Sequence, residues 1–441
     1  MSALKLHTLK QKLWAIVAAS FVARVVMFFA LPNTPSPLGP DEGTYASMVK
    51  WIGDSKPADE FPAYGEGLYL SGRTLLIPAS LLFRAGVNEI DALRLVSTFY
   101  GLCSLVLIVF FIVSIQSRDS GNFLSSQANK NLIVFFLFVF AFLPSHFVWS
   151  NLGLRESVTE FWVISTFMIF FIIFKLHKKI TFPTLLGLFG SIVLTFSARP
   201  QVGWVLGVSL MIFLALNLKN SVSYFLIPLV ICAVLFGSTL NSGSTRTTES
   251  AGSAGSFESA ESALAGAFSP LLTAGEMVSY KQEVNKLDAA SVIETQSCPV
   301  EGLDLVTTPS TRLETYFCIA WRAPYMASTF LFRPILGSDV TSTSSLIAAV
   351  ENIFWLLLFL SIIVLFIRRR AISFLKPLLP SVFFLVLYVL GASAYQGNMG
   401  TGFRHKSLIL WVVLLLIIAL AWKKPEKVSK KSRNNSQESA V

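Results

Sequence analysis

Ten apolar runs divide this sequence, and nearly all of them reach the roughly 17–25 residues that a membrane-spanning helix needs. Across its 441 residues the chain is 54% hydrophobic and only 14% charged, whereas a soluble domain averages about a quarter charged residues. The pattern therefore predicts an all-α membrane protein with about 10 transmembrane helices. The expected spans are residues 13–31, 93–114, 132–150, 155–174, 182–198, 202–217, 222–239, 345–367, 377–395 and 407–422.

Basic residues alternate with these runs in a way that predicts the orientation of the chain. Lys and Arg gather in every second connection, and short basic connections lie on the cytoplasmic side of a membrane. We therefore expect a multi-pass protein of the plasma (inner) membrane with cytoplasmic N- and C-termini. The net charge of +10 then reflects topology rather than nucleic-acid binding. The basic connections contain Lys5, Lys10, Lys12, Lys130, residues 175–179, Lys219, residues 368–370, Lys376 and the tail from Lys423.

The same topology predicts five regions and two long extracytoplasmic loops. Segment 74–86 is apolar but short and contains Pro78, so we expect an interfacial or re-entrant helix, because a span there would invert every later loop. The regions are a cytoplasmic N-terminus (1–12), an N-terminal transmembrane module (13–239) that includes the first loop (32–92), a second loop (240–344) with a flexible Ser/Ala-rich entry, a C-terminal transmembrane module (345–422) and a basic cytoplasmic tail (423–441).

The four cysteines divide between the predicted membrane and the second loop. Cys103 and Cys232 fall inside predicted spans and are expected to be packing residues. Cys298 and Cys318 both lie in the second loop, where an oxidising compartment permits a disulfide. We expect that bridge, with free thiols as the alternative.

Two adjacent carboxylates follow the first span, in the stretch PLGPDEGTYASMVKWIG. Asp41 follows a Gly-Pro turn and precedes apolar residues at helical spacing, so it suits the N-cap of a helix. The same position at the membrane surface also suits a catalytic base. The sequence supports these two roles equally, and one residue can fill both.

Ionisable residues from five segments converge on the predicted outer face. They break the positive-inside pattern, and charge held near a bilayer is costly enough that such groups usually serve a site or a pairing partner. Ion pairs within a helix, a turn residue at Arg199 and an interfacial anchor at Arg404 remain alternatives. The residues are Asp41 and Glu42, His146, then Arg155, Glu156 and Glu160, then Arg199, and finally Arg404, His405 and Lys406.

The two signs of charge indicate what such a site would bind. Arginine side chains hold phosphate bidentately, so a lipid phosphate would suit Arg199, Arg404 and His405. A carboxylate opposite that phosphate would deprotonate an acceptor hydroxyl. Together these groups describe glycosyl transfer from a polyprenyl-phosphate-linked sugar to an extracytoplasmic acceptor in a cell-envelope glycan, lipid or protein.

An Asp-Glu pair in the first outer loop, followed by xxY, resembles the GT-C superfamily of polytopic glycosyltransferases. The similarity is greatest to the protein O-mannosyltransferases and to the lipid A aminoarabinose transferases, and SGRTLLIPASLLFRAGVNEIDALRLVSTFYGL resembles their stretch before the second span. The resemblance implies a GT-C-like architecture. It places Asp41 at the catalytic centre with Glu42 beside it, Glu156 as a second acidic residue and Arg404 on the lipid phosphate; Arg155 and Tyr45 are expected as supporting residues.

Two other functional classes stay open, and so does the question of a cofactor. An oligosaccharide-unit polymerase or ligase needs no first-loop Asp-Glu pair, and a transporter or flippase needs ionisable residues at mid-membrane, where this sequence shows Arg24. Asp41, Glu42 and Glu156 would suit a divalent cation, with His146 as a distant fourth ligand. Nothing in their spacing requires a metal.

Overall fold

A computed structural model describes residues 2–35, 41–56, 65–118, 127–175, 181–217, 309–340, 343–369, 378–395 and 399–421. All regular secondary structure within those ranges is helical. The helices are α1 (Ser2–Ala30), α2 (Glu42–Gly53), α3 (Gly65–Arg84), α4 (Glu89–Arg118), α5 (Gln127–Phe142), α6 (Pro144–Phe147), α7 (Glu156–Lys175), α8 (Phe182–Ala198), α9 (Pro200–Asn217), α12 (Pro309–Phe332), α13 (Thr343–Arg369), α14 (Leu379–Tyr395), α15 (Met399–His405) and α16 (Ser407–Ala421).

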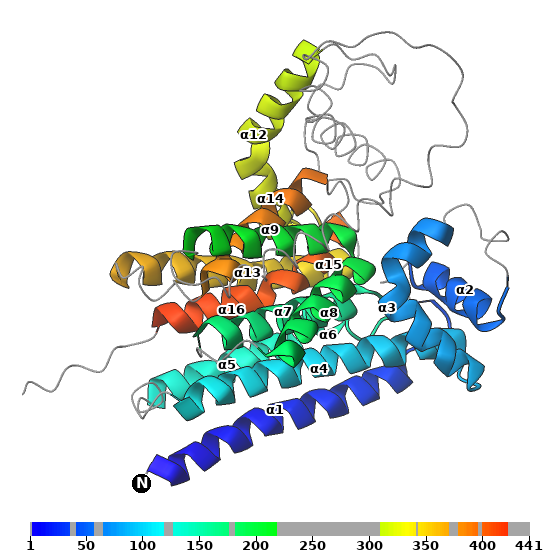
Figure 1. The fold of residues 1–441 in the computed structure, drawn as a ribbon, viewed down its shortest axis with the longest axis horizontal. Helices are drawn as coiled ribbons and strands as arrows, with labels where there is room; N and C mark the ends of the chain where they lie inside the picture. Colours follow the sequence, from blue (N-terminus) through cyan, green and yellow to red (C-terminus); the bar gives the residue numbers. More distant parts are fainter. Residues whose placement is uncertain are drawn as a thin grey trace, which may run out of the picture.

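Most of these helices run side by side along the long axis of the molecule (Figure 1). In that view the start of α1 and the end of α16 lie at the left, whereas α2 and α3 lie at the right. Helix α12 projects from the bundle at a steep angle. Helices α2 and α3 therefore cover the end of the bundle opposite the start of the chain.

Eight of the ten predicted spans coincide with apolar helices in the described part of the chain, a ninth, 132–150, overlaps one over its first part, and the tenth, 222–239, lies outside it. Four helices are long and apolar enough to cross a membrane, at Leu9–Ala30, Glu89–Val113, Glu156–Ile173 and Ser345–Arg368. Five shorter apolar helices are Lys130–Phe142, Phe182–Ala198, Pro200–Leu216, Leu379–Ser393 and Ser407–Leu420. The protein is thus a helical membrane protein.

The predicted run 132–150 is not one helix, and the reason is Pro144. Helix α5 ends at Phe142, Leu143 takes an extended conformation (φ −60°, ψ 130°), and α6 begins at Pro144. A residue before proline is pushed out of the helical region, and proline suits the first position of a new helix. This break turns the following residues into a connection, 148–155, that carries part of the candidate site.

The two predicted outer loops contain more helix than the sequence indicated. Segment 74–86 falls mostly within α3, which continues through Pro78 and packs against α2, α4 and α8. Helix α12 occupies the end of the predicted second loop. Of the two cysteines expected to form a disulfide, Cys298 lies outside the described residues, and the side chain of Cys318 is not described, so the bridge stays a prediction.

Two apolar cores hold the described helices together. The larger core fills the bundle between α4, α5, α7, α8, α9, α14 and α16. The smaller core lies under α2 and α3 and includes Tyr45, Val49, Leu75, Leu93 and Trp149. This second core fixes α2 against the ends of α4 and α7, and so places the Asp-Glu pair over the end of the bundle.

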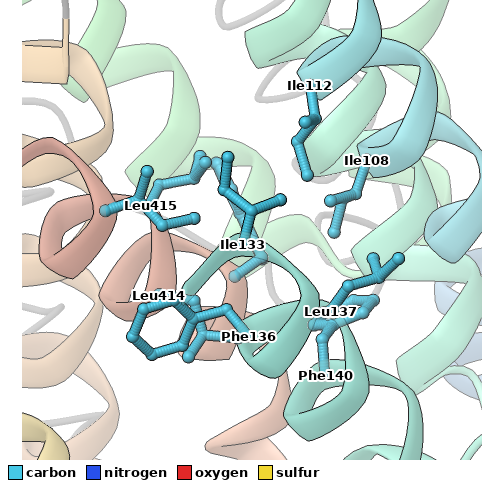
Figure 2. A pocket seen from close by; sticks show the side chains of 10 residues that line it. Ile108, Ile112, Ile133, Phe136, Leu137, Phe140, Leu414 and Leu415 are labelled. Atoms are coloured by element: carbon cyan, nitrogen blue, oxygen red, sulfur yellow. The ribbon is translucent and has the colours of Figure 1, made fainter. Parts of the chain in front are cut away.

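One narrow gap within the larger core is lined by apolar side chains from α4, α5 and α16 (Figure 2). Ile108, Ile133, Phe136 and Leu414 are among its lining residues, and none of the ten is charged. Such a surface offers no group that binds a polar substrate, so this gap is not a candidate active site.

Candidate active site

Seven of the residues singled out in the sequence meet where α2, α7, α9 and α15 begin or end. Their convergence depends on local breaks in the chain. Arg199, for example, is extended (φ −161°, ψ 96°) between the last residue of α8 and Pro200, the first residue of α9, as expected for a residue before proline. The seven are Asp41, Tyr45, Arg155, Glu156, Arg199, Arg404 and His405.

Asp41 is paired with Arg404 at the solvent edge of this group. The Oδ2 atom of Asp41 lies 2.8 Å from Nη1 of Arg404, and the Asp41 side chain is 54% exposed while that of Arg404 is 8% exposed. Asp41 occupies the N-cap position of α2, yet its side chain makes no capping hydrogen bond. Its carboxylate is therefore directed to an arginine 363 residues away and stays accessible to a ligand.

A second and buried arrangement joins Glu156, Arg199 and His405. Arg199 Nη2 donates to Glu156 Oε1 at 3.0 Å, and Arg199 Nη1 contacts Nε2 of His405. A guanidinium group only donates hydrogen bonds, so Nε2 of His405 must accept and the ring is neutral. Burial lowers the pKa of His405 well below its ordinary value, and Arg199, Arg404 and Arg155 lower it further.

Arg155 and Tyr45 complete the group within electrostatic reach of the same residues. Burial raises the pKa of the Tyr45 phenol, and the nearby arginines Arg155 and Arg199 oppose that effect. With His405 neutral, the three arginines and two carboxylates of the group leave one net positive charge. Among these seven residues arginine thus outnumbers carboxylate, which suits an anionic ligand.

Glu42 points away from this group although it follows Asp41 directly. Arg94 donates to both of its carboxylate oxygens, from Nε at 2.8 Å and from Nη2 at 2.9 Å, and neither side chain is exposed. The backbone N–H of Gly153 donates to Oε1 at 3.0 Å. Arg94 also donates to the carbonyl oxygens of Pro32 and Thr34. Glu42 thus links four segments of the chain.

Sequence reasoning did not single out Arg94, although a signal for it existed. Arg94 is an ionisable residue inside the predicted span 93–114, and such residues usually have a partner or a function. Gly153 was missed as well. A Cβ atom there would lie 2.6 Å from Cβ of Leu93 and 3.4 Å from Oε1 of Glu42, so the close approach of this connection to α4 requires glycine.

His146 and Glu160 belong to a separate buried network around Arg24. Arg24 Nη2 lies 3.4 Å from His146 Nδ1 and 3.1 Å from Ser150 Oγ, and His146 Nε2 lies 3.1 Å from Glu160 Oε2. Arg24 is fully buried, and the sequence left its partner open. These contacts tie α1 to α6 and α7 behind the group at Asp41.

Lys406 also turns away from its neighbours Arg404 and His405. Its Nζ donates to the carbonyl oxygen of Arg333 at 3.1 Å and to Oδ1 of Asn352 at 2.6 Å. The lysine therefore attaches α15 to the connection between α12 and α13. Within the described part of the chain, no cluster of three or more His, Cys, Asp or Glu residues could hold a metal ion.

Comparisons with known proteins give one structural similarity. No family model matches the sequence, and no curated protein matches it. Among solved structures the chain is similar to ArnT from Cupriavidus metallidurans in the apo state, with 12% sequence identity, a TM-score of 0.38, and coverage of 90% of this chain and 77% of that chain. At this identity and TM-score the similarity says nothing about the chemistry of this chain.

Proposed function

We propose that this protein is a membrane glycosyltransferase that moves a sugar from a polyprenyl-phosphate carrier to a hydroxyl group outside the membrane. One observation carries the proposal. A half-exposed carboxylate, Asp41, lies 2.8 Å from Arg404 at the edge of a mostly buried group with a net positive charge. The positively charged group suits an anionic leaving group, and the accessible carboxylate suits a base that activates the acceptor.

The positive charge of the group suits the leaving phosphate. When the acceptor oxygen attacks the anomeric carbon, the bond from that carbon to the phosphate oxygen breaks, and its electron pair stays on the phosphate. The phosphodiester carries one negative charge and the released lipid phosphate carries up to two, so negative charge grows as the bond breaks. Arg155, Arg199 and Arg404 therefore stabilise the transition state more than the bound donor, which is the condition for catalysis.

Asp41 takes the role of general base in this scheme. Its carboxylate accepts the proton of the acceptor hydroxyl as the new glycosidic bond forms, and its exposure lets the proton pass to water afterwards. Because Arg404 pairs with Asp41 before the donor arrives, a bound phosphate competes for the same guanidinium group. Donor binding then weakens that pair and frees the Asp41 carboxylate to meet the acceptor hydroxyl.

The position of the group in the bundle supports an extracytoplasmic site. Helix α2, whose N-cap is Asp41, lies at the end of the bundle opposite the start of α1 (Figure 1), and the basic residues Lys10 and Lys12 lie near that start. Basic connections face the cytoplasm, so the site would face the other side of the plasma membrane. The acceptor is then an envelope glycan, lipid or protein.

The direct test compares wild type with Asp41→Asn in membranes and follows the release of labelled sugar from polyprenyl-phosphate donors. A positioned general base contributes about 10²–10⁴-fold, so we expect turnover to fall by at least about 100-fold. Asp54→Asn, an exposed carboxylate at the other end of α2, is the control and should keep wild-type turnover. Both variants are compared at equal expression and membrane insertion.

Two outcomes would redirect the assignment. An Asp41→Asn protein with full turnover would remove Asp41 from the reaction and favour an oligosaccharide polymerase or ligase. A wild-type protein that turns over none of the polyprenyl-phosphate donors would count against a transferase of this class and favour a transporter.

A further inference from the structure

Trp149 lies in the connection between α6 and α7, next to the residues proposed to bind phosphate. Its side chain is 7% exposed. The Cζ atom of Arg404 lies over its ring, 5.9 Å from the centroid, and the ring of Phe403 meets it edge-on at 6.2 Å. Trp149 therefore contacts the segment that presents Arg404.

The indole N–H of Trp149 has no acceptor among the described residues, although it is buried. Buried tryptophan N–H groups normally find a partner, and each exception needs an explanation. Two other buried tryptophans follow that rule. Trp355 donates to Oε1 of Glu351 at 2.9 Å, and Trp411 donates to the carbonyl oxygen of Leu408 at 2.9 Å.

Trp162 also has a buried N–H without an acceptor in the described part of the chain, but its surroundings differ. Its ring packs against Phe161 at 4.8 Å and Tyr100 at 6.2 Å, and no cation–ring contact joins it to an arginine among the described residues. Trp149, in contrast, contacts the guanidinium group of Arg404, which we propose binds an anionic ligand. Trp162, which is only partly buried, therefore serves as a comparison: its N–H has no described acceptor either, but its ring has no described contact with an arginine.

The separation of Trp149 and Arg404 suits a shared ligand. The guanidinium carbon of Arg404 lies 5.9 Å from the centroid of the Trp149 ring, so the two side chains are neighbours at one site. A ligand with several acceptor oxygens can accept from the guanidinium with one oxygen and from the indole N–H at the edge of the ring with another. A phosphate group has several acceptor oxygens and meets this requirement.

We propose that Trp149 is a further donor-binding residue, whose indole N–H donates to an oxygen of the phosphate that Arg404 holds. The inference rests on the proposed function, because it takes the ligand to be the phosphate of a lipid-linked sugar. It supplies an acceptor for a buried donor that has none among the described residues. It also predicts that the hydrogen bond exists only in the complex.

That last point separates the inference from a packing role. Trp149→Phe keeps an aromatic ring under Arg404 and removes the N–H. Since the described structure contains no hydrogen bond from that N–H, the variant should melt at or above the temperature of wild type. Its KM for the lipid-linked donor should rise roughly ten-fold, as expected for one hydrogen bond to a charged group.

Two control variants should leave the donor KM unchanged, unlike Trp149→Phe. Trp411→Phe loses a hydrogen bond that the protein does make, so its melting temperature should fall while its donor KM stays at the wild-type value. Trp162→Phe should change neither quantity. If Trp149→Phe does not accumulate in membranes, Trp149→His, which keeps a ring N–H, should bind the donor more tightly than Trp149→Leu.

A binding measurement keeps this test apart from the test of the proposed function. Thermal stabilisation of purified wild type by a polyprenyl phosphate, and separately by inorganic phosphate, is compared with that of Trp149→Phe. We expect the lipid phosphate to stabilise wild type at concentrations about ten-fold lower than the variant.

Three results would overturn the inference. They are equal stabilisation of wild type and Trp149→Phe, a variant that melts lower with an unchanged KM, and stabilisation by inorganic phosphate alone. Wild-type binding of the lipid phosphate without turnover of any donor would instead refute the proposed function and leave the role of Trp149 standing.

Discussion

Asp41 and Glu42 are neighbours in the sequence, and the structure predicts opposite consequences when each loses its charge. Among the described contacts, Glu42 accepts two hydrogen bonds from Arg94 and one from the backbone of Gly153, and the ion pair is fully buried. Removing one partner of a buried ion pair leaves an uncompensated charge and costs about 3–5 kcal/mol. Asp41 is 54% exposed, and an exposed ion pair contributes about 0–1 kcal/mol.

We therefore expect Glu42→Gln to lower the free energy of unfolding by at least about 2 kcal/mol more than Asp41→Asn. Thermal unfolding of the purified proteins in the same detergent–lipid micelles, followed by circular dichroism, measures that difference. Turnover per folded molecule should show the reverse order, with a large loss in Asp41→Asn and a small loss in Glu42→Gln. The isosteric changes keep side-chain volume constant, so packing does not confuse the comparison.

A double variant tests whether the charge is the cause. Glu42→Gln combined with Arg94→Gln removes both charges of the ion pair. The double variant should therefore recover part of the stability that Glu42→Gln alone loses. If Glu42→Gln kept wild-type stability but lost turnover, Glu42 would take part in the reaction and the reasoning from its contacts would be refuted.

Two further predictions follow from single contacts. His405 is held neutral with its pKa well below the ordinary value, so stability should be constant above about pH 6.5 and fall as the pH drops below it, by about 1.4 kcal/mol per pH unit. Unfolding at pH 7.5 and 5.5 should show this slope in wild type and not in His405→Gln; equal slopes would contradict the assignment. Gly153→Ala should destabilise the protein, because its Cβ would lie 2.6 Å from Cβ of Leu93. Its melting temperature should fall well below that of Gly190→Ala, a position with no atom within 4 Å of an added Cβ, and equal melting temperatures would show that the connection can shift.

The sequence alone predicted the helices and the end of the bundle at which charge collects. Apolar runs of membrane-spanning length and the alternation of basic connections are local patterns, so they can be read without knowing which helices touch. Eight of the ten predicted spans coincide with apolar helices and a ninth overlaps one, and Pro144 was present in the sequence as the cause of the one run that divides. The set of ionisable residues proposed for the site also came from position along the chain.

Only the tertiary structure decided which of those residues face one another. Successive helical residues point about 100° apart, so Asp41 pairs with Arg404 while Glu42 pairs with Arg94. The adjacent letters DE in the sequence do not show which carboxylate has which partner. The partner of Asp41 is 363 residues away, a distance over which no local pattern extends. The N–H of Trp149, which has no acceptor among the described residues, is likewise invisible in sequence, because whether a buried donor has an acceptor depends on every segment packed around it.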